Sequence, residues 1–176
     1  MRFIVWICSL FISIPAWPAL EAGQKAPDFT TQASLGGSPF TYHLADALKK
    51  GPVVVYFYPA AFTKGCSIEA HEFAQAMPQF QALGASVIGV SNDSIEVLNK
   101  FAVSECQSKF PVASDLDQRI TKAYDAVLLW KTNYANRISY VVMPDGKITY
   151  AYSDLSPDKH VENALSALRT AIGSKK

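Results

Sequence analysis

The chain has few cysteines and almost no net charge, and these shortages exclude several classes of function. Its 16 basic and 15 acidic residues leave a net charge of +1 over 176 residues. That balance gives no electrostatic basis for binding nucleic acid or an anionic membrane surface. Internal repeats and low-complexity tracts are also missing. We therefore expect a globular protein that does not act on nucleic acid.

Cysteine is the scarcest residue with a chemical role. Of the three cysteines, Cys8 lies in an apolar run near the start, which leaves Cys66 and Cys106 in the rest of the chain. Neither has a partner at the C-x-x-C spacing of a thiol–disulfide exchange enzyme. No metal-ligand spacing joins the two cysteines to the histidines, which are His43, His71 and His160. The sequence predicts neither a metal site nor a cofactor.

Residues 1–22 differ in character from the rest of the chain. A positive start precedes an apolar run from Phe3 to Ile14, which is too short to span a bilayer comfortably. We interpret this segment as a secretory signal peptide, with cleavage near Ala19 or Ala22. An uncleaved membrane anchor is the alternative. The interpretation predicts an exported protein, in the bacterial periplasm, free of the membrane after cleavage, with residues 23–176 forming one domain.

Two continuous apolar runs predict strands at the centre of a sheet. They are "VVVYFY" at 53–58 and "ASVIGVS" at 85–91. Such runs are typical of strands buried on both faces. Between them, residues 64–83 have apolar side chains at helical spacing and predict a helix, which Pro78 should kink.

The remaining segments alternate in the same way. Residues 23–39 are rich in turn formers and predict an irregular lead-in. The other expected elements are a short strand from Phe40 to Leu44, a helix with an apolar stripe of Ile95, Leu98, Ala102 and Cys106, a strand at 110–115, a short helix at 118–124, a hairpin turning at Asp145-Gly146, and a final helix from Pro157 to Ile172. This order predicts an α/β protein, a three-layer sandwich with a mixed central sheet, compatible with a thioredoxin-like fold.

Cys66 stands at the predicted start of the helix at 64–83. A thiolate is the reactive form of cysteine, and the unpaired N–H groups at a helix N-terminus favour it. Thr63 carries a hydroxyl that can donate to a thiolate or to a bound oxygen atom, and Pro59 can wall off one side of a pocket. The alternative is that Cys66 is an inert thiol packed in the core.

The arrangement of these residues resembles a known family. Pro59-x-x-x-Thr63-x-x-Cys66 matches the P-x-x-x-T-x-x-C signature of peroxiredoxins, and "FYPAAFTKGCSIEAHEF" is most similar to the bacterioferritin-comigratory-protein subgroup, also called peroxiredoxin Q. The likeness extends over roughly residues 23–172, through "GQKAPDFT", "QALGASVIGVSNDS", "FPVASD" and "RISYVVMPDGKI". The resemblance implies a thioredoxin-like fold and a thiol-dependent peroxidase that reduces hydrogen peroxide and organic hydroperoxides.

The resemblance also implies roles for individual residues. Cys66 would be the peroxidatic cysteine that becomes a sulfenic acid, while Thr63 hydrogen-bonds the reacting oxygens and Pro59 shields the sulfenate. Arg137 occupies the place of the family's arginine, although on its own it reads as a solvated charge at a strand end. The competing arginine, Arg119, is expected to be exposed on the short helix.

Two further residues have open roles. Glu69, at the position of the subgroup's glutamate, lies on the same helix face as Cys66 and is expected to hold the arginine. It is equally consistent with a first-turn acid that complements the helix dipole. Many subgroup members carry a resolving cysteine five residues after the peroxidatic one, where this chain has His71, which we expect on the helix surface. Cys106 is then the candidate resolving cysteine, unless it is a core residue and an external thiol reduces the sulfenate.

Two other functions compete with the peroxidase hypothesis on the same fold. One is an exported thiol–disulfide exchange enzyme, and the other is an exported thioredoxin-like binding module. The missing C-x-x-C opposes the first, and the combination of Pro59, Thr63, Cys66 and Arg137 opposes the second. The predicted partners are a peroxide substrate and a thioredoxin-like or other thiol reductant, with the chain a monomer or weak homodimer.

Overall fold

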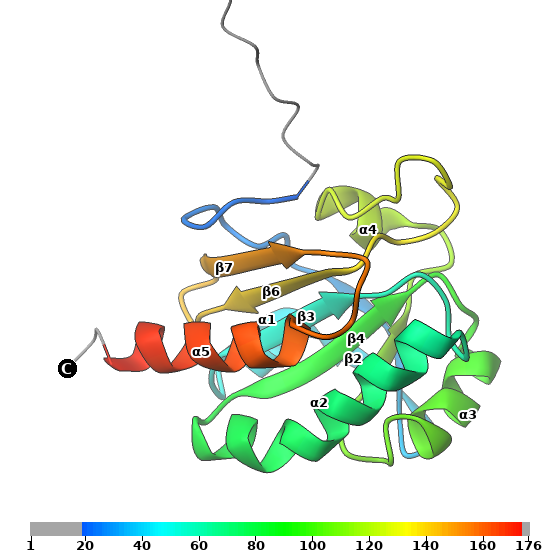
Figure 1. Ribbon diagram of the computed structural model, residues 1–176, viewed down its shortest axis with the longest axis horizontal. Helices are drawn as coiled ribbons and strands as arrows, with labels where there is room; N and C mark the ends of the chain where they lie inside the picture. Colours follow the sequence, from blue (N-terminus) through cyan, green and yellow to red (C-terminus); the bar gives the residue numbers. More distant parts are fainter. Residues whose placement is uncertain (1–18, 174–176) are drawn as a thin grey trace, which may run out of the picture.

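The computed structural model describes residues 19–173, which surround one mixed β-sheet (Figure 1). The strands of this part are β1 (Thr30–Leu35), β2 (Ser38–His43), β3 (Val53–Phe57), β4 (Ser86–Ser91), β5 (Val112–Ser114), β6 (Ile138–Val142) and β7 (Ile148–Ser153). Its helices are α1 (Leu44–Leu48), α2 (Lys64–Ala82), α3 (Ile95–Ser104), α4 (Arg119–Ala123) and α5 (His160–Gly173). The signal peptide predicted for residues 1–22 lies almost wholly outside the described residues and stays a prediction.

The sheet has the order β2-β1-β5-β4-β3-β6-β7. Strands β3, β4 and β5 run parallel, and the other neighbouring pairs are antiparallel. The parallel strands are joined by the long helices, as β-α-β connections require. The mixed sheet predicted from the alternation of strands and helices is therefore confirmed.

Strand β3 separates two hydrophobic cores. Its residues alternate, so that Val53, Val55 and Phe57 pack on one face with residues of α1 and α4. On the other face Val54 and Tyr56 pack with residues of α2, α3 and α5. Figure 1 shows α2 and α5 lying along that second face. Burial on both faces explains the unbroken apolar run, and it confirms the three-layer α/β sandwich.

Three predicted boundaries were wrong. Part of the expected irregular lead-in is strand β1, which pairs with both β2 and β5. Helix α3 ends at Ser104, so Cys106 lies in the turn after the helix and not on its stripe. Helix α5 begins at His160, after a turn in which the His160 N–H donates to the carbonyl of Pro157 at 3.3 Å. Helix α2 continues through Pro78.

The hairpin of β6 and β7 determines where the candidate site forms. It turns as predicted at Gly146, which has a φ of +78° that favours glycine. Strand β6 pairs antiparallel with β3, with Ile138 opposite Phe57. The residue that precedes β6 therefore lies beside the segment that follows β3, and this segment leads into α2. Among the described helices, none is long and apolar enough to cross a membrane.

Candidate active site

Cys66 is the third residue of α2 and is held at the end of the central strand. Thr63 is the N-cap residue, and its carbonyl accepts the N–H of Ser67 at 2.9 Å. The first backbone N–H groups of a helix have no carbonyl acceptor within the helix. They therefore present partial positive charge near the Cys66 sulfur. Cys66 is 1% exposed. The predicted position at a helix N-terminus is confirmed.

The loop that carries Pro59 and Thr63 is fixed by hydrogen bonds of its own. Thr63 Oγ1 donates to the carbonyl of Ala60 at 3.0 Å, and the N–H of Ala61 donates to Asp93 Oδ2 at 2.7 Å. Pro59 is half-buried and Thr63 is exposed. Because the Thr63 proton is given to Ala60, its oxygen offers lone pairs to other groups. The hydroxyl proton is thus directed at the loop backbone, whereas the sequence predicted donation to a thiolate or a bound oxygen atom.

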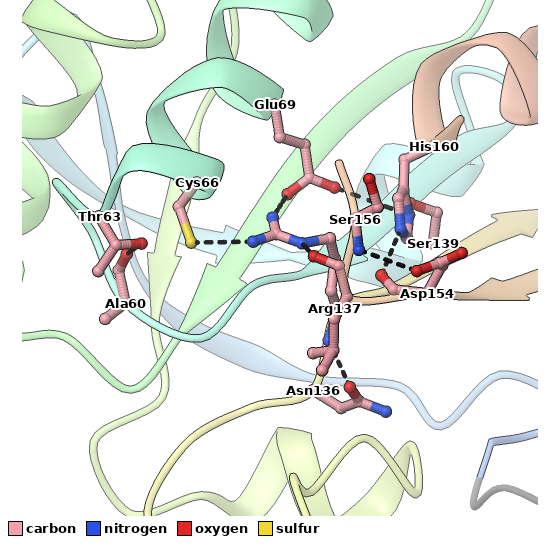
Figure 2. Close-up of polar contacts among 11 residues, drawn as sticks. Ala60, Thr63, Cys66, Glu69, Asn136, Arg137, Ser139, Asp154, Ser156 and His160 are labelled. Carbon is pink, nitrogen blue, oxygen red and sulfur yellow. Dashed lines mark hydrogen bonds and ion pairs between the residues drawn. The ribbon is translucent and has the colours of Figure 1, made fainter. Parts of the chain in front are cut away.

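Arg137 lies directly beside the sulfur. Its Nη2 donates to Cys66 Sγ at 3.5 Å (Figure 2). Its Nε donates to the carbonyl of Leu155 at 2.9 Å. The side chain is buried, with the residue only 4% exposed, so it is not a solvated strand-end charge. Gly65 leaves room for it, since a Cβ there would lie 3.1 Å from Nη2. By contrast the side chain of Arg119 is 72% exposed, as expected, and it pairs with Asp117.

Glu69 completes this group from the next turn of α2. Arg137 Nη1 donates to Glu69 Oε2, and the carboxylate is fully buried. Burial raises the pKa of Glu69, whereas the charge and the hydrogen bond of the guanidinium oppose this rise and favour the carboxylate form. Burial lowers the pKa of Arg137, but the charges of Glu69 and Cys66 outweigh it and leave the pKa raised. Glu69 therefore contacts the arginine, as one of its two interpretations predicted.

Cys106 is free and buried in the same hydrophobic core as Cys66. Burial, with the nearby Glu105, raises the pKa of its thiol well above the ordinary value. His71 Nε2 lies 3.5 Å from Glu105 Oε2, so the residue before Cys106 contacts α2 five residues after Cys66. His71 is exposed enough to fit the expected helix-surface position.

Sequence reasoning missed several residues of this site. Asp93 follows β4 and binds the loop before α2, while Ser139 and His160 lie behind Glu69 (Figure 2). A short polar segment directly after a buried strand was the available signal for Asp93. Leu155 contributes its backbone carbonyl, and the identity of a residue does not indicate what its carbonyl will bind. In residues 19–173 no cluster of three or more His, Cys, Asp or Glu is placed to hold a metal ion.

A buried thiol at a helix N-terminus, in contact with a buried arginine on this mixed sheet, is the arrangement expected of a thioredoxin-like protein with thiol redox chemistry. The AhpC/TSA family matches residues 22–151. "Peroxiredoxin Bcp" of Escherichia coli K12 is 31% identical over 155 residues, which cover 85% of this chain and 96% of the relative. The chain belongs to the AhpC/TSA family of peroxiredoxins, and it is a thiol-dependent peroxidase.

Solved structures agree with this assignment. Peroxidoxin BcpB from Mycobacterium tuberculosis is 30% identical with a TM-score of 0.77, covering 86% of this chain and 97% of that one. A mutant of PrxQ from Xylella fastidiosa is 28% identical with a TM-score of 0.77, covering 87% and 98%. These likenesses confirm the thioredoxin-like peroxiredoxin fold and the resemblance to the Bcp and PrxQ subgroup.

Proposed function

We propose that Cys66 is the peroxidatic cysteine and that Arg137 is its electrostatic partner. The observation that carries the proposal is the 3.5 Å contact between Cys66 Sγ and Arg137 Nη2 inside the protein. A guanidinium that remains charged favours the ionised sulfur, and low surrounding polarity strengthens the attraction. Glu69 and the Leu155 carbonyl keep the guanidinium from turning away.

The reaction follows from this geometry. The Cys66 thiolate attacks the terminal oxygen of hydrogen peroxide or an organic hydroperoxide, so that an S–O bond forms and the O–O bond breaks. The sulfur is oxidised to a sulfenic acid, and the leaving oxygen takes a proton and departs as water or an alcohol. Arg137 stabilises the negative charge that spreads over the O–O bond. The Thr63 oxygen can accept a hydrogen bond from the hydroperoxide O–H, and Pro59, on the same loop, would shield the sulfenate.

Peroxide consumption by the reduced protein tests this assignment. We expect wild type to consume hydrogen peroxide in the presence of a dithiol and Cys66→Ser to show no consumption above the buffer. Cys106→Ser is the matched control, because its first oxidation should proceed at the wild-type rate. Equal, slow consumption by wild type and Cys66→Ser would disprove the role of Cys66 and favour the binding-module alternative.

We infer further that Cys106 resolves the sulfenic acid. Its thiolate would attack Cys66 sulfur, form an S–S bond and release the sulfenic oxygen as water. Two observations support this: both thiols lie in one core, and Glu105 contacts α2 at His71. The disulfide requires the two Cα atoms to lie within about 7 Å of each other, and we expect local unwinding of the first turn of α2 and of the turn after α3 to bring the thiols together.

Mass spectrometry of non-reduced peptides tests the resolving step. After one equivalent of peroxide, we expect wild type to contain a Cys66–Cys106 disulfide. After excess peroxide, which supplies the second oxidation, we expect Cys106→Ser to accumulate Cys66 as sulfinic acid. Finding Cys106 free while wild-type Cys66 is hyperoxidised would instead establish a one-cysteine cycle with an external thiol.

The partners and location belong to the same proposal. A thioredoxin-like dithiol is the reductant that suits an intramolecular disulfide, since exchange proceeds through a mixed disulfide. The apolar run at 3–14 supports export to the periplasm, and the balanced charge gives no basis for a nucleic acid partner. We propose a monomer or weak homodimer, which sedimentation of the reduced and oxidised protein would test.

A further inference from the structure

A buried polar cluster lies behind the Arg137–Glu69 pair and has no part in the reaction described above. It consists of Ser139 on β6 and His160, the first residue of α5, both essentially inaccessible to solvent. Ser139 Oγ lies 2.8 Å from His160 Nδ1, and His160 Nε2 lies 2.9 Å from the carbonyl of Asp154 (Figure 2). The imidazole therefore joins three elements at one point: β6, the loop after β7 and α5.

The hydrogen bonds determine which ring nitrogen of His160 carries the proton. A carbonyl oxygen can only accept, so Nε2 carries the proton and donates it to Asp154. Nδ1 then carries a lone pair, which accepts a hydrogen bond from the hydroxyl of Ser139. Burial lowers the pKa of His160 to about 4, which keeps the ring neutral near physiological pH.

This tautomer matters for Glu69. Its Oε1 lies 3.7 Å from His160 Nδ1 and has no hydrogen-bond partner in the described structure, although it is buried. The lone pair of Nδ1 offers it no proton. Glu69 is therefore held by the hydrogen bond that Arg137 Nη1 donates to its other oxygen, Oε2.

His160 also reaches Arg137 by a second route. Its Nε2 binds the carbonyl of Asp154, and Arg137 Nε binds the next carbonyl, that of Leu155, at 2.9 Å. The N–H of Asp154 returns to the carbonyl of Arg137 at 3.3 Å. The loop segment that holds the guanidinium is therefore itself held by the imidazole.

We propose that His160, with Ser139, is a positioning residue for Arg137. It fixes the loop carbonyl that receives Arg137 Nε, and it presents Glu69 with a lone pair in place of a competing donor. A proton on Nδ1 would draw Glu69 away from the guanidinium and weaken the contact between Arg137 and Cys66. This inference rests on the proposed role of Cys66.

The groups that face the imidazole are consistent with this role. Glu69 approaches from α2, and the charge of Arg137 disfavours protonation of the ring. The ring of Tyr152 on β7 packs edge-on at 4.8 Å and supplies no charge. The Asp154 carboxylate favours protonation, but less than burial opposes it.

The test compares His160→Phe, which keeps a ring but removes both nitrogens, with His160→Gln, which can keep a donor to Asp154. The readouts are the rate constant of reduced protein with hydrogen peroxide and the pH profile of Cys66 alkylation by iodoacetamide. We expect His160→Phe to lower the peroxide rate constant at least tenfold and to move the alkylation profile to higher pH. His160→Gln should stay within about threefold of wild type.

Leu168→Ala is the matched control, because Leu168 is buried on the same helix α5 but outside the polar cluster. It should lose stability and keep the wild-type profile. Wild-type behaviour in His160→Phe, or an equal shift in Leu168→Ala, would overturn the inference. Alkylation needs no peroxide, so an inactive wild type would count against the proposed function and leave the positioning of Arg137 to be judged from the profile.

Nuclear magnetic resonance of the imidazole provides a second test that does not depend on a destabilised variant. The chain has three histidines, which individual substitutions would assign. We expect His160 to be the neutral Nε2–H tautomer from pH 8 down to about 5. We expect Ser139→Ala, which removes the donor to Nδ1, to gain a proton on Nδ1 at a higher pH than wild type does and to react more slowly with peroxide. An imidazolium or an Nδ1–H tautomer in wild type at pH 7 would refute the proposal.

Discussion

At the scale of the residue, the site depends on one side chain serving several partners. Arg137 contacts Cys66, Glu69 and Leu155 through different nitrogens of one planar group. Lysine has a single nitrogen and cannot reproduce this arrangement. Gly65 has no Cβ, and this allows the guanidinium of Arg137 to lie close to the backbone of α2.

Gly65→Ala should separate stability from activity. Alanine is favoured over glycine inside a helix by up to about 1 kcal/mol, so the free energy of unfolding should stay the same or rise. The new Cβ, 3.1 Å from Nη2, should displace the guanidinium and slow the reaction of Cys66 with peroxide on the order of tenfold. Urea unfolding and stopped-flow kinetics would measure the two effects.

Gly173→Ala provides the comparison for that experiment. Gly173 ends α5 and has nothing within 4 Å of an added Cβ, so its replacement should leave the reaction with peroxide unchanged. Wild-type kinetics in Gly65→Ala would show that the close approach of Arg137 is not needed.

At the scale of the element, the loop between β3 and α2 is fastened to the end of β4. Asp93 Oδ2 accepts the N–H of Ala61 and the hydroxyl of Ser91, at 2.7 and 2.8 Å. The next residue, Ser94, caps α3 by accepting the N–H of Val97. One short segment therefore anchors the loop before Cys66 and starts the helix that leads toward Cys106.

Asp93→Ala should release this loop. The loss of hydrogen bonds to a carboxylate should lower the free energy of unfolding by about 1.5–3 kcal/mol. The reaction with peroxide should also slow, because Thr63 and the start of α2 lose their anchor. Urea unfolding would measure the loss of stability, and alkylation of Cys66 would measure the change at the site. Asp93→Asn should fall between wild type and Asp93→Ala in both measurements, because its amide oxygen can still accept a hydrogen bond.

Asp117→Ala is a suitable control for Asp93→Ala. Asp117 is a largely exposed carboxylate whose partner, Arg119, is exposed as well. Surface pairs of this kind contribute little to stability. If the two alanine variants behave alike, the hydrogen bond to Ala61 does not organise the loop.

The elements that could be predicted from sequence are those with a strong local pattern. Strands β3 and β4 are unbroken apolar runs, and the turn after β6 has the Asp145-Gly146 pair. Strand β1 has no such pattern, because only Ala33 and Ser34 of it are buried, and its pairing with β2 and β5 makes it a strand. Helix α5 starts later than Pro157 indicated because side-chain bonds of the 154–158 segment hold a turn there.

The site was less predictable than the fold. Residue types placed Cys66 at a helix start, but Arg137 was identified only through the resemblance, since nothing local marks an arginine 71 residues away. The interaction of Glu69 with Arg137 was one of two open interpretations. His160 was considered only as a metal ligand, and its role as a neutral buried group depends on contacts that the chain makes only when folded.

At the scale of the whole molecule, the buried titratable groups make stability depend on pH. The pKa of His160 is lowered from 6.5 to about 4 on folding, so the unfolded chain binds more protons between these values. The contribution of the neutral His160 to the free energy of unfolding is therefore complete above pH 6.5, and it is lost as the pH falls toward 4. Glu69 has the opposite effect on stability. Burial raises its pKa, so the folded chain binds more protons than the unfolded chain, and the free energy of unfolding falls as the pH rises above the ordinary pKa of a glutamate.

His160→Phe should therefore change the pH dependence of unfolding. Between pH 6.5 and 4, wild type should lose about 3 kcal/mol more of its free energy of unfolding than the variant does. Urea titrations at a series of pH values would measure the difference. Parallel curves for the two proteins would mean that His160 is not held neutral in the folded state.

The antiparallel pairing of β3 with β6 has a consequence for biogenesis. Cys66 meets its guanidinium only after residues 138–142 have docked beside 53–57. A chain in which this long-range strand pair has not formed therefore lacks the contact between Cys66 and Arg137, and we expect rapid capture of peroxide only after the pair has closed. Recovery of peroxide reactivity during refolding would time the closure of the sheet.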